Sequence, residues 1–554
     1  MQLTVQSNLK APSHSLGDTP LEAKRTGATT YAPIAIAALA GFALIAVATR
    51  NGIGLSVDSA FYISVARELA AGNGLTVPWG TPEPTAMGTR WAPLMPGILA
   101  AVAQLGIDPV DSVRWVNAIC LAGTAAICGF AIRRVTRSLA LGVLVACMIV
   151  TSRTMLAVFA MAWSEPIFIL CATLSLVLLA EFLRTRRMIL LVATLTAVSA
   201  ACLTRYAGAS LAVAAFACLL LQPGRWLIRS LAAACAALMA FAPMYPGGPT
   251  WIAWMQAHRG GLTEDAHHST ALEVLRIHEG LDAVTQWLWP WGLAGGRSIG
   301  AAYQMIVVTG AVVALIVVTI SSWRHLHQKR ASTTSGEELA AAAGVFLAAY
   351  LILIIAAVTL FGRTVSFNHR ILLPLFPPAA VMIAVGCKML QAKGRLSPRI
   401  VRGSAALCLL FVGIRAIGAV DYCGYIASGH GFGAQNYQHA SWRTSPTIRE
   451  LDRLPPNATI YSNAPDAIYL LTGRNAIWAS LLDRPEGNPD AGHSPPFPNK
   501  ASPAYLVFFD RLSWRPSSPK RDEIAAWPLS ALARAQDGEI FAFTEVVSCS
   551  ELPE

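Results

Sequence analysis

Charged side chains are scarce in this sequence. Asp, Glu, Lys and Arg together make up 13% of its 554 residues, whereas hydrophobic residues make up 55% and the mean hydropathy is +0.51. An average globular domain carries about 25% charged residues. The shortage of charge and the apolar excess exclude an ordinary soluble domain and predict a polytopic α-helical membrane protein.

Sequence motifs for several kinds of chemistry are missing as well. There is no Walker loop and no glycine-rich dinucleotide fingerprint, so the chain encodes no nucleotide energy source. Ser, His and Asp occur without a nucleophile-elbow signature, which leaves a hydrolase triad without support. None of the 11 cysteines shows metal-ligand spacing. The histidines between 245 and 300 also lack carboxylate or cysteine ligands at fixed spacing. No metal ligand set is therefore predicted, and whether a divalent ion takes part stays open.

Apolar runs long enough to cross a bilayer recur about eleven times. A polar tail, 1–30, precedes the first run, which has no small-residue cleavage site after it and is therefore expected to be an uncleaved span. The expected spans are 32–49, 112–132, 138–154, 164–183, 188–203, 207–222, 228–244, 301–321, 338–361, 370–388 and 402–420.

Basic residues indicate how these spans are oriented. The net charge of +11 would suggest a nucleic-acid partner in a soluble chain, but here Lys and Arg cluster in short loops between apolar runs. Six such loops all lie on one side if the amino terminus is cytoplasmic, as the positive-inside rule requires. They contain Lys24-Arg25, Arg133-Arg134, Arg184 with Arg186-Arg187, Arg225 with Arg229, Lys329-Arg330, and Lys388 through Arg402. No nucleic acid is predicted, and 50–111, 245–300 and everything after 420 are expected outside.

The chain changes character after residue 420. Residues 421–554 contain many prolines and charges, with strand-like runs at 459–461 and 504–509. They predict a small extracytoplasmic α/β domain that follows a transmembrane domain at 31–420. Cysteines inside apolar runs, such as Cys120, act as small buried side chains. A disulfide between Cys423 and Cys549 is compatible with an extracytoplasmic tail.

The segment directly after the first span carries the first functional candidate, Asp58. A carboxylate where a membrane span ends is costly to desolvate and is therefore a candidate site residue. Apolar residues at three- and four-residue spacing predict a short amphipathic helix from Asp58 to Gly72 on the outer membrane surface. The simpler interpretation is that Ser56 or Asp58 caps this helix. An apolar run of about thirteen residues from Pro93 predicts a second surface helix.

Three further motifs carry charge at the outer ends of spans. Glu165 follows Ser164 and is either part of a helix start or a second acid at the depth of Asp58. Arg205, followed by Tyr206, either binds an anion such as a lipid phosphate or extends to the headgroups. Arg370 is either a phosphate or sugar contact or the flank of a helix that Pro374 kinks.

In their order, the four motifs resemble the polytopic glycosyltransferases of the GT-C fold, above all the protein O-mannosyltransferase and aminoarabinose (lipid A) transferase relatives. Asp58, Tyr62 and Ala66 match an Asp-x-x-x-Tyr-x-x-x-Ala arrangement that this family has in its first outer loop. The resemblance covers roughly 30–420. Two positions depart from the family: Ser59 stands where many relatives have a second acid, and Ala92-Pro93 replaces a proline pair.

The resemblance implies transfer of a sugar from a polyprenyl-phosphate donor to an acceptor at the extracytoplasmic face of the cell membrane. It implies an inverting reaction with Asp58 as general base and Glu165 placing the acceptor or the sugar hydroxyls. Arg205 and Arg370 would neutralise the departing lipid phosphate. Besides these two arginines, the substrate-binding residues that it implies are Tyr62, Arg67 and Tyr206.

Two other functions are compatible with the same sequence. A non-catalytic protein that binds or transports polyprenyl-phosphate sugars would need the arginines but not Asp58. A secondary transporter would place its charges near the bilayer midplane in two related halves. The sequence has no such halves, and its charges gather at the outer surface, so this third function is the least favoured.

Overall fold

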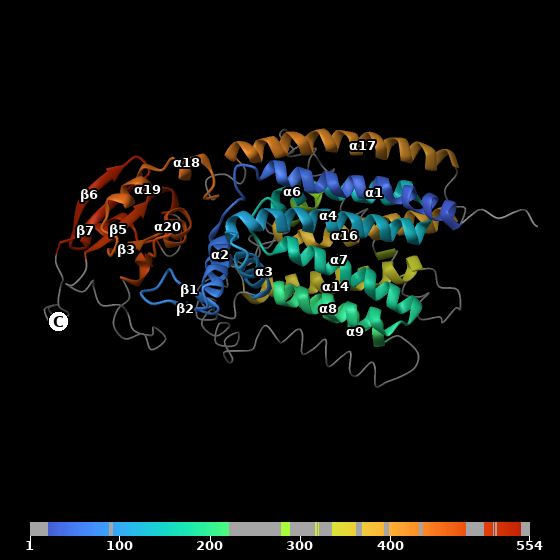
Figure 1. The fold of residues 1–554 in the computed structure, drawn as a ribbon, viewed down its shortest axis with the longest axis horizontal. Coiled ribbons are helices and arrows are strands. Elements are labelled where there is room, and N and C mark those ends of the chain that lie inside the picture. Colours follow the sequence, from blue (N-terminus) through green and yellow to red (C-terminus); the bar gives the residue numbers. More distant parts are fainter. Residues whose placement is uncertain are drawn as a thin grey trace, which may run out of the picture.

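The computed structural model describes residues 20–87, 92–220, 279–287, 316–317, 319–320, 335–361, 368–392, 398–430, 436–482, 503–513, 515 and 518–544. In this part of the chain, long helices lie side by side and a unit with a sheet follows at one end (Figure 1). Three predicted features lie outside the described residues: the span 228–244, most of the span 301–321, and most of the loop 245–300. Cys549 lies outside them too, so its pairing with Cys423 stays a prediction.

The long helices make this chain an integral membrane protein. The described residues contain six helices long and apolar enough to span a bilayer, or seven if α5 and α6, bent by 54°, count as one span. They correspond to seven of the predicted spans, and α8 and α9 are shorter apolar helices at two more. The bounds are α1 Pro20–Ala48, α4 Pro109–Thr136, α5 Leu139–Val150, α6 Arg153–Phe159, α7 Glu165–Thr185, α8 Met188–Thr204, α9 Ala209–Leu220, α14 Ser335–Phe361, α15 His369–Leu372, α16 Phe376–Ala392 and α17 Pro398–Tyr425.

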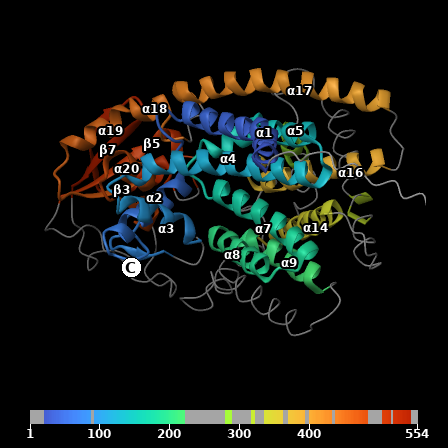
Figure 2. The ribbon, with the colours of Figure 1, turned by 45° about the vertical axis from the view of Figure 1, so that its right-hand side comes forward.

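Helix α17 lies on the outside of the bundle, along α1 (Figure 2). Its apolar side chains Leu407, Leu410 and Ile417 are largely exposed, as expected of a helix that faces lipid. One polar side chain, Arg415, points inward and is almost fully buried. Its guanidinium donates to the carbonyl of Met148, at 3.1 Å, in the last turn of α5. Arg415 thereby stabilises the break between α5 and α6, because a cation favours the carbonyl end of a helix.

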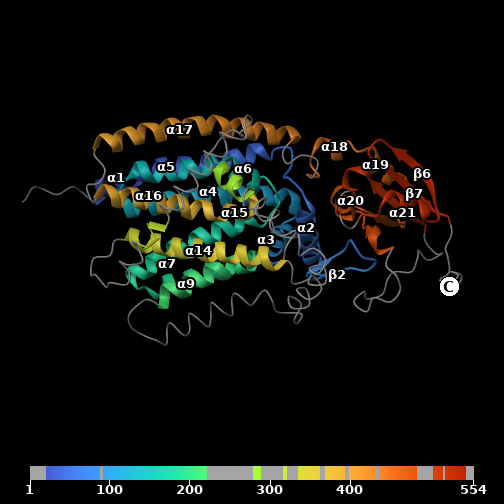
Figure 3. The same ribbon diagram turned by 180° about the vertical axis from the view of Figure 1, so that it is seen from behind.

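The segment between α1 and α4 contains α2 (Val57–Ala70), β1 (Thr76–Val77), β2 (Thr85–Ala86) and α3 (Leu94–Ala103). Both predicted surface helices are therefore present as α2 and α3. Helix α2 is, however, covered on two sides and does not lie on an open surface. Tyr62 and Ile63 pack into the core of the helix bundle, whereas Val65 packs against Trp79 and Tyr469. Views from opposite sides both place α2 between the bundle and the terminal unit (Figure 3).

The terminal unit is built around a five-stranded sheet of order β4-β3-β5-β7-β6. Strand β3 pairs in parallel with β4 and β5, and β7 is antiparallel to β5 and β6. Both strand-like runs of the sequence are strands, β3 and β5; the location of the unit outside the cell stays a prediction. The bounds are α18 Ala440–Arg443, α19 Pro446–Glu450, β3 Thr459–Ser462, α20 Pro465–Thr472, β4 Ile477–Trp478, β5 Ala504–Phe509, α21 Arg521–Ala526, β6 Leu529–Ala535 and β7 Gly538–Phe543.

This unit is bonded to the segment that leads into α2. The Tyr437 amide donates to the Leu55 carbonyl, and the Leu55 amide donates to Asn436 Oδ1, both at 2.9 Å. Gly80, after β1, pairs with Ile477 of β4. The backbone three residues before Asp58 is therefore held by the terminal unit as well as by the bundle.

A buried polar network supports this contact. Asp466 is fully buried and pairs with Arg515, at 2.9 Å, and with the hydroxyl of Tyr437. Arg515 also donates to the Tyr437 hydroxyl at 2.6 Å. Burial, together with the Asp466 carboxylate, raises the pKa of Tyr437 well above its usual value, so the hydroxyl stays protonated and donates to Asp466.

We expect Asp466→Ala to destabilise the terminal unit by about 3–5 kcal/mol, because it leaves the Arg515 guanidinium buried without its counter-charge. Thermal unfolding and limited proteolysis of the purified full-length protein measure the effect. Asp452→Ala is the matched control, since Asp452 is exposed on the same unit. Equal stability of the two variants would contradict a supporting role for the network.

Candidate active site

The start of α2 is capped by two serines, and this leaves Asp58 available for other contacts. Ser56 is the N-cap residue, and its backbone amide donates to Ser59 Oγ at 3.0 Å. Trp163 Nε1 donates to Ser56 Oγ at 2.8 Å. Ser59 is fully buried and fills the third position of a capping box. The departure from the family at Ser59 therefore has a structural use, and Ser56 rather than Asp58 caps the helix.

Backbone pairing brings the second acid to the first. Gly54 and Met161 form a parallel bridge in which the Gly54 amide donates to the Ala160 carbonyl and the Ala162 amide donates to the Gly54 carbonyl, both at 2.8 Å. The segment that leads to Asp58 and the segment that leads to Glu165 therefore run side by side in the same direction. Glu165 begins α7, and its side chain is 1% exposed.

Two arginines converge on the Glu165 carboxylate. Arg205 Nη1 donates to Glu165 Oε1 at 2.6 Å, and Arg370 donates to the same oxygen through Nε and to Oε2 through Nη2, the latter at 3.4 Å. Arg370 Nη1 also pairs with Asp58 Oδ2 at 2.5 Å. We call Asp58, Glu165, Arg205 and Arg370 the Arg370 cluster; its formal charges sum to zero.

Exposure differs within the cluster. Glu165 is buried at the bottom, whereas the side chains of Asp58, Arg205 and Arg370 are 26%, 23% and 21% exposed. Glu165 has both oxygens occupied by guanidinium donors and no access to solvent. Its geometry favours the positioning of the two arginines over the predicted contact with an acceptor or a sugar.

The position of Arg370 is fixed from several sides. Asn368 caps α15 by accepting from the Ile371 amide at 2.9 Å. The helix then tightens into a 3-10 turn at Leu373–Leu375, where Pro374 lacks a backbone donor. The kink predicted at this proline stays a prediction. The guanidinium carbon of Arg370 lies 4.0 Å from the ring centroid of Trp163, in a cation–π contact.

Tyr62 adjoins the cluster through Ser164. The Tyr62 hydroxyl donates to Ser164 Oγ at 3.1 Å, and Arg205 donates to the same oxygen at 3.1 Å. Burial raises the pKa of Tyr62 to about 12, so its hydroxyl remains a donor. The sequence pointed to Tyr62 but assigned neither Ser164 nor Trp163 to the site, although both stand beside Glu165 in the same motif.

The other predicted site residues lie differently. Arg67 is nine residues from Asp58, about 13 Å along the helix, and pairs with Asp108 at 2.9 Å. Arg67 therefore joins α2 to the start of α4 and is not part of the Arg370 cluster. Tyr206, next to Arg205, has a buried hydroxyl that forms no hydrogen bond with any described residue. Across the described ranges, no three His, Cys, Asp or Glu side chains gather in a way that would hold a metal ion.

We expect Glu165→Gln to lower the stability of the protein much more than Asp58→Asn. The first change leaves two guanidiniums around a buried neutral group, at a cost on the order of 3 kcal/mol, whereas the partly exposed Asp58 pair contributes about 1 kcal/mol or less. Thermal unfolding of the detergent-purified protein measures both, with Glu68→Gln on α2 as control. Equal destabilisation by the two variants would show that the acids are equivalent.

No protein-family model and no curated protein sequence matches this chain. Among solved structures, ArnT from Cupriavidus metallidurans bound to undecaprenyl phosphate is 12% identical with a TM-score of 0.47, over 94% of this chain and 99% of that one. Its apo state is 13% identical with a TM-score of 0.48, over 94% and 98%. The Archaeoglobus fulgidus oligosaccharyltransferase tethered with an acceptor peptide is 13% identical with a TM-score of 0.47, over 93% and 74%. Both enzymes are glycosyltransferases of the GT-C fold that the motifs resemble.

Proposed function

We propose that this protein is a membrane glycosyltransferase that moves a sugar from a polyprenyl-phosphate donor to an acceptor at the extracytoplasmic face. The observation that carries the proposal is the Arg370 cluster. It combines two partly exposed guanidiniums with a partly exposed carboxylate, Asp58, at one end of a bundle of membrane helices. The guanidiniums suit a phosphate leaving group and the carboxylate suits an acceptor proton.

The donor side of the site is formed by Arg205 and Arg370. Arginine binds phosphate through two parallel N–H donors, which a lipid-linked sugar phosphate offers at the membrane boundary. When the bond between the anomeric carbon and the phosphate oxygen breaks, negative charge grows on that oxygen. Guanidiniums already fixed by Glu165 stabilise this charge without reorganising.

Asp58 accepts the proton of the acceptor. Its carboxylate removes the proton from the attacking group, which bonds to the anomeric carbon from the side opposite the phosphate. The electron pair of the broken bond leaves with the polyprenyl phosphate, and the anomeric configuration inverts. A single general base of this kind contributes about 10²–10⁴-fold to the rate.

The ion pair between Asp58 and Arg370 couples the two halves of the reaction. In this pair the Arg370 N–H occupies the Asp58 Oδ2 atom, so that oxygen is not free to accept a hydrogen bond from an acceptor hydroxyl. The phosphate of the sugar donor, when it binds Arg370, competes with Asp58 for the Arg370 N–H group. Donor binding therefore frees the base, and Asp58 becomes active only when a sugar is present to be transferred.

The test is Asp58→Asn in transfer from a synthetic polyprenyl-phosphate sugar. We expect the rate to fall by about 10²–10⁴-fold. Donor affinity should be unchanged or higher, because the competing carboxylate is gone and both arginines remain. Glu68→Gln, on the same helix and outside the cluster, should transfer at the normal rate.

The competing function is a protein that binds or transports polyprenyl-phosphate sugars without transferring them. It shares the arginines but needs no base. Near-normal transfer by Asp58→Asn at normal membrane levels would refute the assignment of the base. Donor binding without any transfer by the unmodified protein, across a panel of acceptors, would favour the non-catalytic function.

A further inference from the structure

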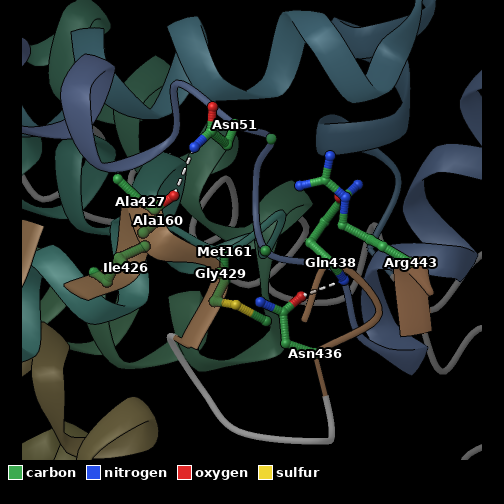
Figure 4. Close-up of a pocket in the computed structure, with 11 residues that line it drawn as sticks. Asn51, Ala160, Met161, Ile426, Ala427, Gly429, Asn436, Gln438 and Arg443 are labelled. Atoms are coloured by element: carbon green, nitrogen blue, oxygen red, sulfur yellow. Dashed lines mark hydrogen bonds between the residues drawn. The ribbon is translucent and has the colours of Figure 1, made fainter. Parts of the chain in front are cut away.

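A pocket lies at the junction of the bundle and the terminal unit, beside the segment that leads to α2 (Figure 4). Its space is about 340 Å³ when its open mouth is counted. Two of the residues that line the pocket, Gly54 and Met161, form the backbone bridge described above. No member of the Arg370 cluster lines the pocket. The pocket is lined by Asn51, Gly52, Gly54, Ala160, Met161, Ile426, Ala427, Gly429, Asn436, Gln438 and Arg443.

The lining is polar on one side and apolar on the other. Gln438 and Arg443 approach the pocket from one side, and Ile426 and Ala427 from the other (Figure 4). Arg443 is the one charged residue in the lining. Its side chain is exposed, and it forms no ion pair within the described part of the chain. The pocket therefore offers an uncompensated positive charge.

Glycines shape the wall that faces Arg443. Gly52 has a φ of +118°, and a Cβ there would lie 3.1 Å from the side-chain amide of Gln438. The sulfur of Met161 lies against Gly54, so that a Cβ added to Gly54 would be only 2.1 Å from it. The backbone at Gly52 and Gly54 can approach the side chains of Gln438 and Met161 this closely only because both residues lack a side chain. The side-chain amide of Gln438 therefore lies against this wall.

The pocket opens where two membrane helices end. Helix α1 ends at Ala48, three residues before Asn51. The apolar span that begins in α17 at Ala406 continues through the π-helical turn Ile426–His430 as far as Gly429. On these helices Val47 and Tyr425 are about half exposed, at 48% and 49%. The mouth therefore lies at the boundary of hydrocarbon and water, where the headgroups of lipids are found.

We propose that this pocket, the Arg443 pocket, binds the phosphate headgroup of an anionic membrane lipid. The guanidinium of Arg443 receives the phosphate, and the side-chain amide of Gln438 supplies a neutral polar contact beside it. The acyl chains lie outside the pocket, along the exposed side chains of α1 and α17. The enclosed part of the pocket is small, so the phosphate lies at its mouth and the rest of the lipid lies outside.

The pocket is connected to the active site through the backbone. Gly54 lies four residues before Asp58, and Met161 lies four residues before Glu165. A lipid in the Arg443 pocket would thus stabilise the bridge that brings the two acids together. The binding itself does not depend on the proposed transferase activity.

The test is native mass spectrometry of the delipidated full-length protein with phosphatidylglycerol, phosphatidylcholine or inorganic phosphate. We expect phosphatidylglycerol to bind more tightly than phosphatidylcholine, and Arg443→Gln to weaken it about fivefold. Arg449→Gln is the matched control, because it removes the same charge from an exposed residue six positions away and outside the pocket. Arg443→Lys should retain part of the affinity, since it keeps the charge.

The proposal would be overturned by an equal loss in Arg443→Gln and Arg449→Gln, by no loss in Arg443→Gln, or by full competition by millimolar inorganic phosphate. The last result would assign the pocket to a free anion. Arg205→Gln should bind phosphatidylglycerol normally, because Arg205 belongs to the Arg370 cluster and does not line the Arg443 pocket. Loss of lipid binding in Arg205→Gln would place the lipid in the Arg370 cluster and would refute the Arg443 pocket.

Discussion

The guanidinium of Arg370 is the contact on which the site depends. Two carboxylates, Asp58 and Glu165, come from different helices to the same end of a membrane bundle, where like charges repel and desolvation is costly. Arg370 lies between them and pairs with both. Its own place is set by the Asn368 cap and the Trp163 ring. Removing this cation would take from Asp58 its partner in the cluster and would leave Glu165 with Arg205 alone.

The two acids differ in burial, and the proposed function gives them different tasks for that reason. Glu165 is buried against two guanidiniums, a position that suits the placing of positive charge. Asp58 keeps a quarter of its side chain exposed and shares one N–H donor with Arg370. In the function proposed here, the phosphate of the sugar donor competes for this Arg370 N–H group and thereby releases Asp58.

The terminal unit contributes to the site without lining the cluster. Its residues Asn436 and Tyr437 bond the backbone at Leu55, three residues before Asp58. The buried Asp466–Arg515 pair fixes Tyr437 in turn. The bridge between Gly54 and Met161 fixes the same segment to the residues that lead into α7. The segment before the proposed base is therefore held by both the helix bundle and the terminal unit, and the Arg443 pocket lies where these two meet.

The sequence by itself determined the membrane class, most of the described spans, the two short helices after α1, and which charges stand at span ends. These features follow from composition and local periodicity, which neighbouring residues fix. It could not determine that Ser59 serves the cap, that Glu165 holds two arginines, or that Arg67 pairs with Asp108. These three contacts were decided by the tertiary structure. Partners such as Glu165 and Arg370 are 205 positions apart, and only the packing of whole helices brings such side chains together.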